Sequence, residues 1–196
     1  MVTVYLRDIR KDVVSAWEAE FAGETGVHVS HGDIFGLKAD AIVSPANSFG
    51  YMDGGIDLVY CNFFGWDLES RLRQLLTEHH FGELPVGQAV VVPTQHEAIP
   101  FLVSAPTMRV PAAISRTVNV YLAFRAALIA VLAHNHGDDT PISSLLVPGL
   151  GTGVGDMPPG RAARQMKLAY RAILKGEARK ERNIGAIWGE HYELVA

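Results

Sequence analysis

Residues 39–60 read ADAIVSPANSFGYMDGGIDLVY, and this stretch indicates the fold class of the chain. Its first part, Ala39–Val43, is an apolar run interrupted only by Asp40, as expected for a strand that is buried on both faces of a sheet. A polar, glycine-rich loop follows at Ser44–Gly55, and the next residues predict a helix over Ile56–Phe64. A strand, a glycine-rich loop and a helix in this order are typical of α/β proteins.

On both sides of this unit, apolar segments alternate with segments of helical periodicity. The further strands that we predict are Val2–Leu6, Val27–Ser30, Val90–Val92, Phe101–Ser104, Leu145–Val147 and Ile184–Trp188. The further helices are Asp12–Phe21, a leucine-rich stretch from Leu68 that Gly82 closes, a segment from Ser115 to His134 that Ser115 caps, and Pro159–Lys175. This alternation predicts an α/β fold with a largely parallel sheet, and we expect a single domain over residues 1–196.

The composition excludes several classes of protein. The chain of 196 residues has a net charge of −4 and 48% apolar residues, so it is neither disordered nor a charged tail. It has no run of lysine or arginine, which argues against binding to nucleic acid. The longest apolar run, Ala126–Ala133, is far shorter than the ~20 residues that span a bilayer. The N-terminus does not read as a signal peptide, so we expect a cytoplasmic protein that does not bind membranes.

A second glycine-rich loop, Pro148–Gly155, lies between a predicted strand and the helix that begins near Pro159. Its alternating glycines allow backbone N–H groups to converge on an anion, and Thr152 adds a hydroxyl donor. The alternative is a turn whose glycines serve close packing, but the order of strand, loop and helix favours phosphate binding. The loop fits neither a Walker A motif, since no lysine follows the last glycine, nor the dinucleotide fingerprint.

Polar residues at the ends of predicted strands are candidates for ligand binding. Asn47 could bind a ribose hydroxyl, and Gly54-Gly55 permits a close approach of the backbone. Asp57 lies in the first turn of a predicted helix, and Asp33 could accept a hydrogen bond from an exocyclic amine. Each also has a purely structural interpretation: an Asx turn for Asn47, a helix-dipole acid for Asp57, and a cap or turn for Asp33. For Asp33 alone, the sequence favours that structural interpretation.

The sequence predicts neither a metal site nor a nucleophilic residue. Its eight histidines are not spaced as ligands; the adjacent His79 and His80, for example, would point to different faces of a helix. Cys61 has no strongly electropositive neighbours in the sequence, which favours a buried structural thiol over a reactive one.

Taken in order, these segments resemble a macrodomain. The resemblance is carried by Gly32-Asp33-Ile34, Ala39–Val43, Ala46-Asn47-Ser48, Gly54-Gly55-Ile56-Asp57 and Pro148–Val154. It extends from Val27 to Trp188, and residues 1–26 resemble the N-terminal strand-helix extension of some microbial and phage-like members. The resemblance implies a three-layer α/β/α fold with a mostly parallel, mixed central sheet.

The resemblance also implies a ligand, ADP-ribose or an ADP-ribosylated protein, and no cofactor. Asp33 would accept a hydrogen bond from the adenine amine near the Ile34 backbone, and Asn47 would face the distal ribose. Either Trp188 or Tyr192 could cover the adenine. The phosphates would lie against two segments: Gly54, Gly55 and Ile56 in the first loop, and Pro148, Gly149, Leu150, Gly151, Thr152, Gly153 and Val154 in the second.

For activity, the resemblance implies hydrolysis of mono-ADP-ribose adducts or ADP-ribose derivatives, with Asn47 and Asp57 as catalytic residues that position a water or the distal ribose. Two alternatives are a binding module without catalysis and a phosphoesterase that acts on ADP-ribose-1″-phosphate or a related nucleotide. The chain also departs from the family pattern. Ser44-Pro45 replaces an Asn-Ala pair, and Asp53 stands where many members have a third glycine.

Overall fold

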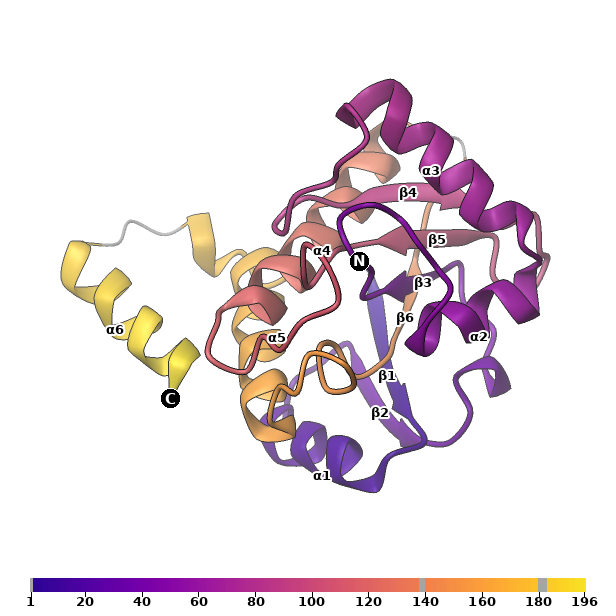
Figure 1. Ribbon diagram of the computed structural model, residues 1–196. Coiled ribbons are helices and arrows are strands. Elements are labelled where there is room, and N and C mark those ends of the chain that lie inside the picture. Colours follow the sequence, from indigo (N-terminus) through magenta and orange to yellow (C-terminus); the bar gives the residue numbers. More distant parts are fainter. Residues whose placement is uncertain (1, 138–139, 180–182) are drawn as a thin grey trace.

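The computed structural model describes residues 2–137, 140–179 and 183–196, and its centre is a mixed, mostly parallel β-sheet (Figure 1). The strands lie in the order β2-β1-β6-β3-β5-β4, and β4 is antiparallel to β5 while the other pairs are parallel. The strands are β1 (Thr3–Asp8), β2 (Val27–His31), β3 (Ala41–Ser44), β4 (Val90–Pro93), β5 (Phe101–Ser104) and β6 (Ser144–Val147). The predicted α/β fold class is therefore confirmed.

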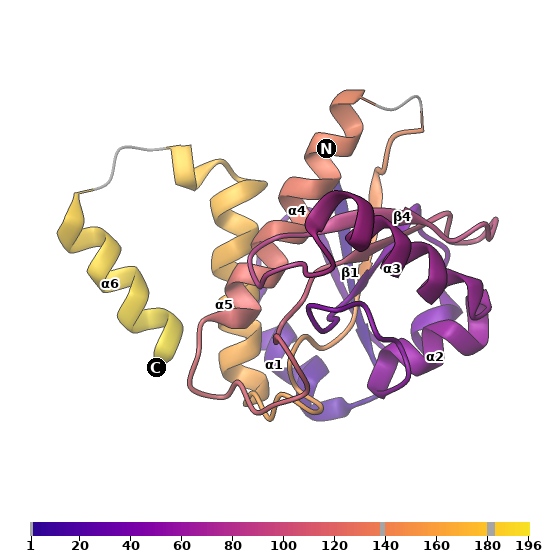
Figure 2. The ribbon, with the colours of Figure 1, turned by 45° about the horizontal axis from the view of Figure 1, so that its top comes forward.

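Helices cover both faces of this sheet and give three layers (Figures 1 and 2). One apolar cluster joins the sheet to α1 (Lys11–Glu20), α4 (Asn119–Gly137) and α5 (Pro159–Ile173). A second joins the opposite face to α2 (Gly55–Phe64) and α3 (Asp67–His80). Alternation along β3 explains the two clusters, because Ala41 and Val43 enter the first and Ile42 enters the second. The continuous apolar run of this strand thus reflects burial on both faces.

The strand β1 lies inside the sheet, between β2 and β6, and pairs with both in parallel. Val4 and Leu6 are fully buried in the first apolar cluster. The strand-helix segment at the N-terminus is therefore a structural part of the sheet and of one covering layer.

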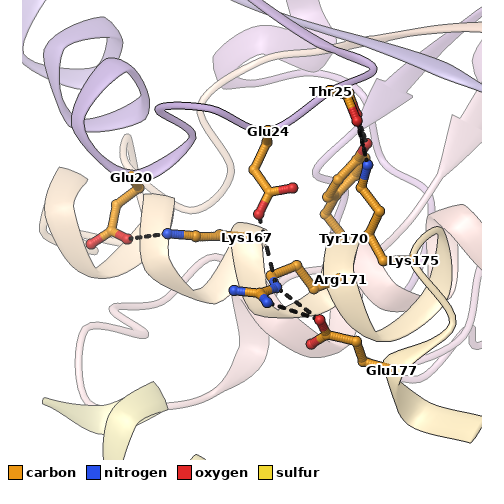
Figure 3. Close-up of polar contacts among 8 residues, drawn as sticks. All are labelled: Glu20, Glu24, Thr25, Lys167, Tyr170, Arg171, Lys175 and Glu177. Carbon is orange, nitrogen blue, oxygen red and sulfur yellow. Dashed lines mark hydrogen bonds and ion pairs between the residues drawn. The ribbon is translucent and has the colours of Figure 1, made fainter.

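Polar contacts also fix the end of α1 and the segment that follows it to α5 (Figure 3). Glu20 pairs with Lys167 at 3.7 Å and Glu24 with Arg171 at 3.8 Å, while the Tyr170 hydroxyl donates to the Thr25 carbonyl at 2.6 Å. The ion pairs are partly exposed and contribute little individually. The bond from buried Tyr170 is worth more, because losing it would leave a polar group without a partner.

One predicted element is wrong, and the predicted start of one helix is wrong. The segment Ile184–Trp188 is not a strand but the start of a helix, α6 (Ile184–Val195), whose N-cap Asn183 accepts from the Ala186 N–H at 2.9 Å. The predicted helix at Ser115 begins only at Asn119, where the Thr117 hydroxyl accepts from the Asn119 N–H at 3.2 Å. Short apolar runs fit both periods, and a cap residue near a helix start is easily misplaced by one turn.

Helix α6 packs on α5 through its last turn, where Leu194 is buried (Figure 2). Gln165 of α5 donates to the Leu194 carbonyl at 2.8 Å. Within the described ranges, none of the helices has the length and apolar character needed to cross a membrane.

Candidate functional site

A cleft of about 510 Å³ opens at the carboxyl ends of β1, β3 and β6. Parallel sheets bind ligands at this edge, because the connecting loops of neighbouring strands meet there. Four connections, with the residues next to them, line the cleft: the β1–α1 turn, the β3–α2 loop, the β5–α4 connection and the β6–α5 loop. They contribute Asp8, Ile9, Arg10, Pro45, Ala46, Asn47, Tyr51, Asp53, Gly54, Gly55, Ile56, Asp57, Val59, Thr107, Met108, Pro111, Gly149, Gly151, Thr152, Gly153, Val154 and Gly155.

The β3–α2 loop is organised by Asn47. Its Oδ1 accepts from the Phe49 N–H at 3.0 Å, and its Nδ2 donates to the Tyr51 carbonyl at 2.7 Å. This is the Asx-type geometry of the structural interpretation, although Nδ2 carries a second hydrogen and Asn47 lines the cleft. The side chain therefore holds the loop and retains one donor for a ligand.

The same loop ends at the first turn of α2, where Gly54 is the N-cap and Gly55 has a φ of +57°. A β-carbon at either glycine would have nothing within 4 Å, so the backbone here is open to the cleft. Ile56 is half-buried and also lines the cleft. These residues offer backbone N–H groups that the helix itself leaves without partners.

Asp57 is buried in the first turn of α2, with 7% of its surface exposed. Its Oδ1 accepts a hydrogen bond from the Ser44 hydroxyl at 2.6 Å. Burial raises the pKa of Asp57 to about 7, and the Ser44 bond opposes that rise. Because Asp57 also lines the cleft, a carboxyl that exchanges its proton near neutral pH adjoins the space where a ligand would lie.

In the β6–α5 loop, the glycines differ in how closely their surroundings pack against them. Gly151 has a φ of +69°, and a β-carbon there would lie 2.8 Å from Ile114 and 2.9 Å from Val120. Gly153 has nothing within 4 Å of that position. Packing thus accounts for the glycine at 151, as in the alternative interpretation, although Gly151 lines the cleft together with Gly153 and Val154. Pro148 and Leu150 are buried and do not line it.

Asp8, the last residue of β1, and Arg10, in the β1–α1 turn, hold the β6–α5 loop and were not among the predicted site residues. Asp8 Oδ2 accepts from the Gly149 N–H at 3.0 Å, and Arg10 Nη1 donates to the Thr152 carbonyl at 2.7 Å. Asp8 and Gly149 are 141 positions apart, and no sequence motif links them. Ile9, between Asp8 and Arg10, is 70% exposed at the edge of the cleft.

Asp33 lies beside the cleft but does not line it. Its carboxylate caps a short 3₁₀ turn, Ile34–Gly36, by accepting from the Phe35 N–H at 3.0 Å, and Ile34 is buried. Its carbonyl accepts from Arg7 Nε at 2.7 Å, so Asp33 adjoins the end of β1. Its carboxylate therefore has the cap role of the structural interpretation.

The two C-terminal aromatics do not lie at the cleft. Trp188 and Tyr192 are exposed on α6, stack on each other at 5.9 Å, and are absent from the cleft lining. Burial raises the pKa of the Cys61 thiol to about 11, so this cysteine is not an activated nucleophile. Across the described part of the chain, no cluster of three or more acidic, histidine or cysteine side chains is suited to hold a metal.

Comparison with known proteins places the chain in a family. The family model described as "Macro domain" matches residues 43–166, which include both glycine-rich loops. The chain belongs to the macro domain family. An uncharacterised protein of Aquifex aeolicus is 36% identical to this macro domain over 140 residues, which cover 71% of the chain and 78% of that protein.

Solved macrodomains share the fold of this one at lower identity. The macrodomain of Mycobacterium tuberculosis DarG aligns with a TM-score of 0.61 and 21% identity, covering 73% of this chain and 88% of that one. A Trypanosoma brucei macrodomain in complex with ADP-ribose aligns with a TM-score of 0.54 and 20% identity, covering 75% and 56% respectively. These likenesses show the fold, and the predicted family resemblance is confirmed.

Proposed function

We propose that this macro domain binds ADP-ribose in the cleft and hydrolyses mono-ADP-ribose adducts there. The observation that carries the proposal is the position of Asp57, a buried carboxyl that lines a cleft between two glycine-bearing loops. The macrodomain complex with ADP-ribose supports the choice of ligand. Family membership alone supports binding, while the protonation behaviour of Asp57 supports catalysis.

Binding would use backbone donors more than charged side chains. The cleft is lined by Asp8, Asp53 and Asp57 but by one cation among the described residues, Arg10, which is itself paired with Asp12 at 2.5 Å. A diphosphate would therefore depend on N–H groups of the Gly54–Ile56 and Gly151–Val154 segments, since the Gly149 N–H already donates to Asp8. An additional terminal phosphate would meet further carboxylates, so we favour ADP-ribose adducts over ADP-ribose-1″-phosphate.

Hydrolysis would proceed by general base catalysis. In an ester adduct, Asp57 takes a proton from water as the water oxygen attacks the ester carbonyl carbon. The bond between that carbon and the ribose oxygen then breaks, and the proton passes to the ribose oxygen. The products are ADP-ribose and the free carboxylic acid. Asn47 would bind the distal ribose through its remaining amide hydrogen, which fixes the adduct relative to the water.

Calorimetric titration with ADP-ribose, AMP and ribose-5-phosphate tests the binding step. We expect micromolar affinity for ADP-ribose and much weaker binding of both fragments, since each would occupy part of the cleft.

The variant Gly153→Glu places a charge in the cleft without displacing neighbours, and should weaken ADP-ribose binding by roughly tenfold or more. The matched control is Gly160→Glu, an open glycine in the first turn of α5, which should bind as the wild type does. Equal affinities in the two variants would refute the cleft assignment.

Single-turnover release of ADP-ribose from a mono-ADP-ribosylated protein tests the chemical step. The wild type should release ADP-ribose, and Asp57→Asn should lower the rate far more than it lowers the affinity, because a proton acceptor acts in the transition state. Binding without release by the wild type would leave the alternative, a binding module without catalysis.

A further inference from the structure

Two serines end neighbouring strands beside the proposed site. Ser44 of β3 and Ser104 of β5 are register partners in parallel strands, so their side chains project to the same face of the sheet. Both are buried, with 0% and 1% of their surfaces exposed. Their hydroxyls differ in one respect: Ser44 Oγ donates to Asp57 Oδ1, whereas Ser104 Oγ has no partner among the described residues.

Few other groups act on the Asp57 carboxyl. Tyr60 and Cys61 lie on the same helix, but the Tyr60 hydroxyl donates to the Val43 carbonyl at 3.1 Å and not to Asp57. The other charges that act on these two neighbours are negative: Asp8, at the end of β1, on Tyr60, and Glu69 of α3 on Cys61. Arg10 and Asp53 line the same cleft as Asp57, and Arg10 is paired with Asp12. No ion pair to Asp57 occurs within the described ranges, and Ser44 is the hydrogen-bond donor to its side chain there.

The two oxygens of Asp57 therefore have different surroundings. Ser44 is fully buried and does not line the cleft, so the oxygen that it binds lies on the interior side. Asp57 itself lines the cleft, which leaves Oδ2 for the ligand side. A hydroxyl has one proton to donate, and donating it to a carboxyl favours the ionised form.

We propose that Ser44 is a positioning residue, whose hydroxyl holds Asp57 Oδ1 so that Oδ2 faces the cleft as the proton acceptor. This inference rests on the proposed hydrolysis and names a residue that departs from the family pattern. Ser44 is buried and does not line the cleft, so it acts through Asp57. Its removal should change the ionisation of Asp57 and the pH dependence of turnover, and should leave KM nearly unchanged.

The test compares Ser44→Ala with Ser104→Ala, a matched control that removes an equally buried but unbonded hydroxyl from the neighbouring strand. Carbon-13 NMR of the Asp57 carboxyl follows its titration directly in both variants and in the wild type. Ser44→Ala should raise the pKa of Asp57, because the bond that opposes the effect of burial is lost. Ser104→Ala should leave it unchanged, and Ser44→Thr, which keeps a hydroxyl, should restore it.

Turnover gives a second readout. On the acidic limb of the plot of kcat against pH, each unit of increase in the Asp57 pKa lowers kcat by about tenfold. At high pH, where Asp57 is ionised in every protein, kcat of Ser44→Ala and Ser104→Ala should equal that of the wild type. An Asp57 titration that is the same in Ser44→Ala and the wild type would overturn the proposal, whatever the activity. If the wild type releases no ADP-ribose, the proposed hydrolysis fails and the proton transfer with it. The NMR titration then still decides whether Ser44 fixes the ionisation of Asp57.

Discussion

Asp57 combines two properties that conflict in most side chains. It is an acid in the first turn of a helix, where the dipole favours negative charge, yet it is buried without a cation beside it among the described residues. Burial has the larger effect, and its pKa rises from 3.8 to about 7. The folded protein then binds a proton more tightly than the unfolded chain, so this residue stabilises the fold less as pH rises from about 4 to about 7.

We therefore predict that Asp57→Asn becomes stabilising relative to the wild type as pH rises. Below about pH 4 the carboxyl is protonated in both states and contributes no difference; the difference then grows and becomes constant above about pH 7. Its upper limit is roughly 1.4 kcal/mol for each unit by which the pKa is raised. Urea unfolding of both proteins at pH 4, 5.5 and 7.5 measures this difference, and a difference that does not change with pH would contradict the assigned ionisation.

The connections between elements give the cleft its shape. Each glycine-rich loop follows a strand, but neither loop holds its form alone. The β3–α2 loop depends on the side chain of Asn47, and the β6–α5 loop depends on Asp8 at the end of β1 and on Arg10 in the β1–α1 turn. Residues from the end of β1 and the turn after it thus order the loop to which we assign the diphosphate.

We predict that Asp8→Ala weakens ADP-ribose binding and lowers the free energy of unfolding by about 1–3 kcal/mol, because the Gly149 N–H loses its acceptor. The control is Asp12→Ala, the neighbouring carboxylate, which pairs with Arg10 on the exposed surface and has no bond to the β6–α5 loop. We expect only a small loss of stability and affinity from it. Calorimetry and urea unfolding of the two variants give both quantities, and similar losses in both would argue against the role of Asp8.

At the scale of the molecule, the folded unit is larger than the stretch that matches the family model. Residues 43–166 include neither β1 nor α1, yet β1 lies between β2 and β6 and α1 buries Trp17 against α5. Helix α6, by contrast, adds one buried side chain, that of Leu194.

The two ends of the chain should therefore respond differently to truncation. A protein lacking residues 1–26 loses a strand from the interior of the sheet and should not unfold cooperatively. A protein lacking residues 183–196 loses α6, exposes Gln165, and should still show a single cooperative transition at lower urea concentration. Far-ultraviolet circular dichroism during urea titration distinguishes these outcomes. Cooperative unfolding of the protein that lacks residues 1–26 would contradict the structural role of β1.

The sequence by itself determined those features of the protein that depend on residues close together in the chain. The apolar run Ala39–Val43 predicts a buried strand, and the glycines of both loops predict close backbone approach at the ends of strands. From these signals follow the fold class and the two loops of the cleft, while the family was expected from the resemblance of several segments taken in order. Periodicity and turn chemistry act over a few residues, so a sequence shows them directly.

Only the tertiary structure decided which groups meet and how they ionise. It placed Asp8 against Gly149, inserted β1 into the sheet, and left Asp33 as a cap at the side of the cleft. It also buried Asp57 and joined it to Ser44, which makes a first-turn acid into a carboxyl with a pKa of about 7. The physical reason is that burial and long-range contacts depend on how the layers pack, and no short stretch of sequence records that packing.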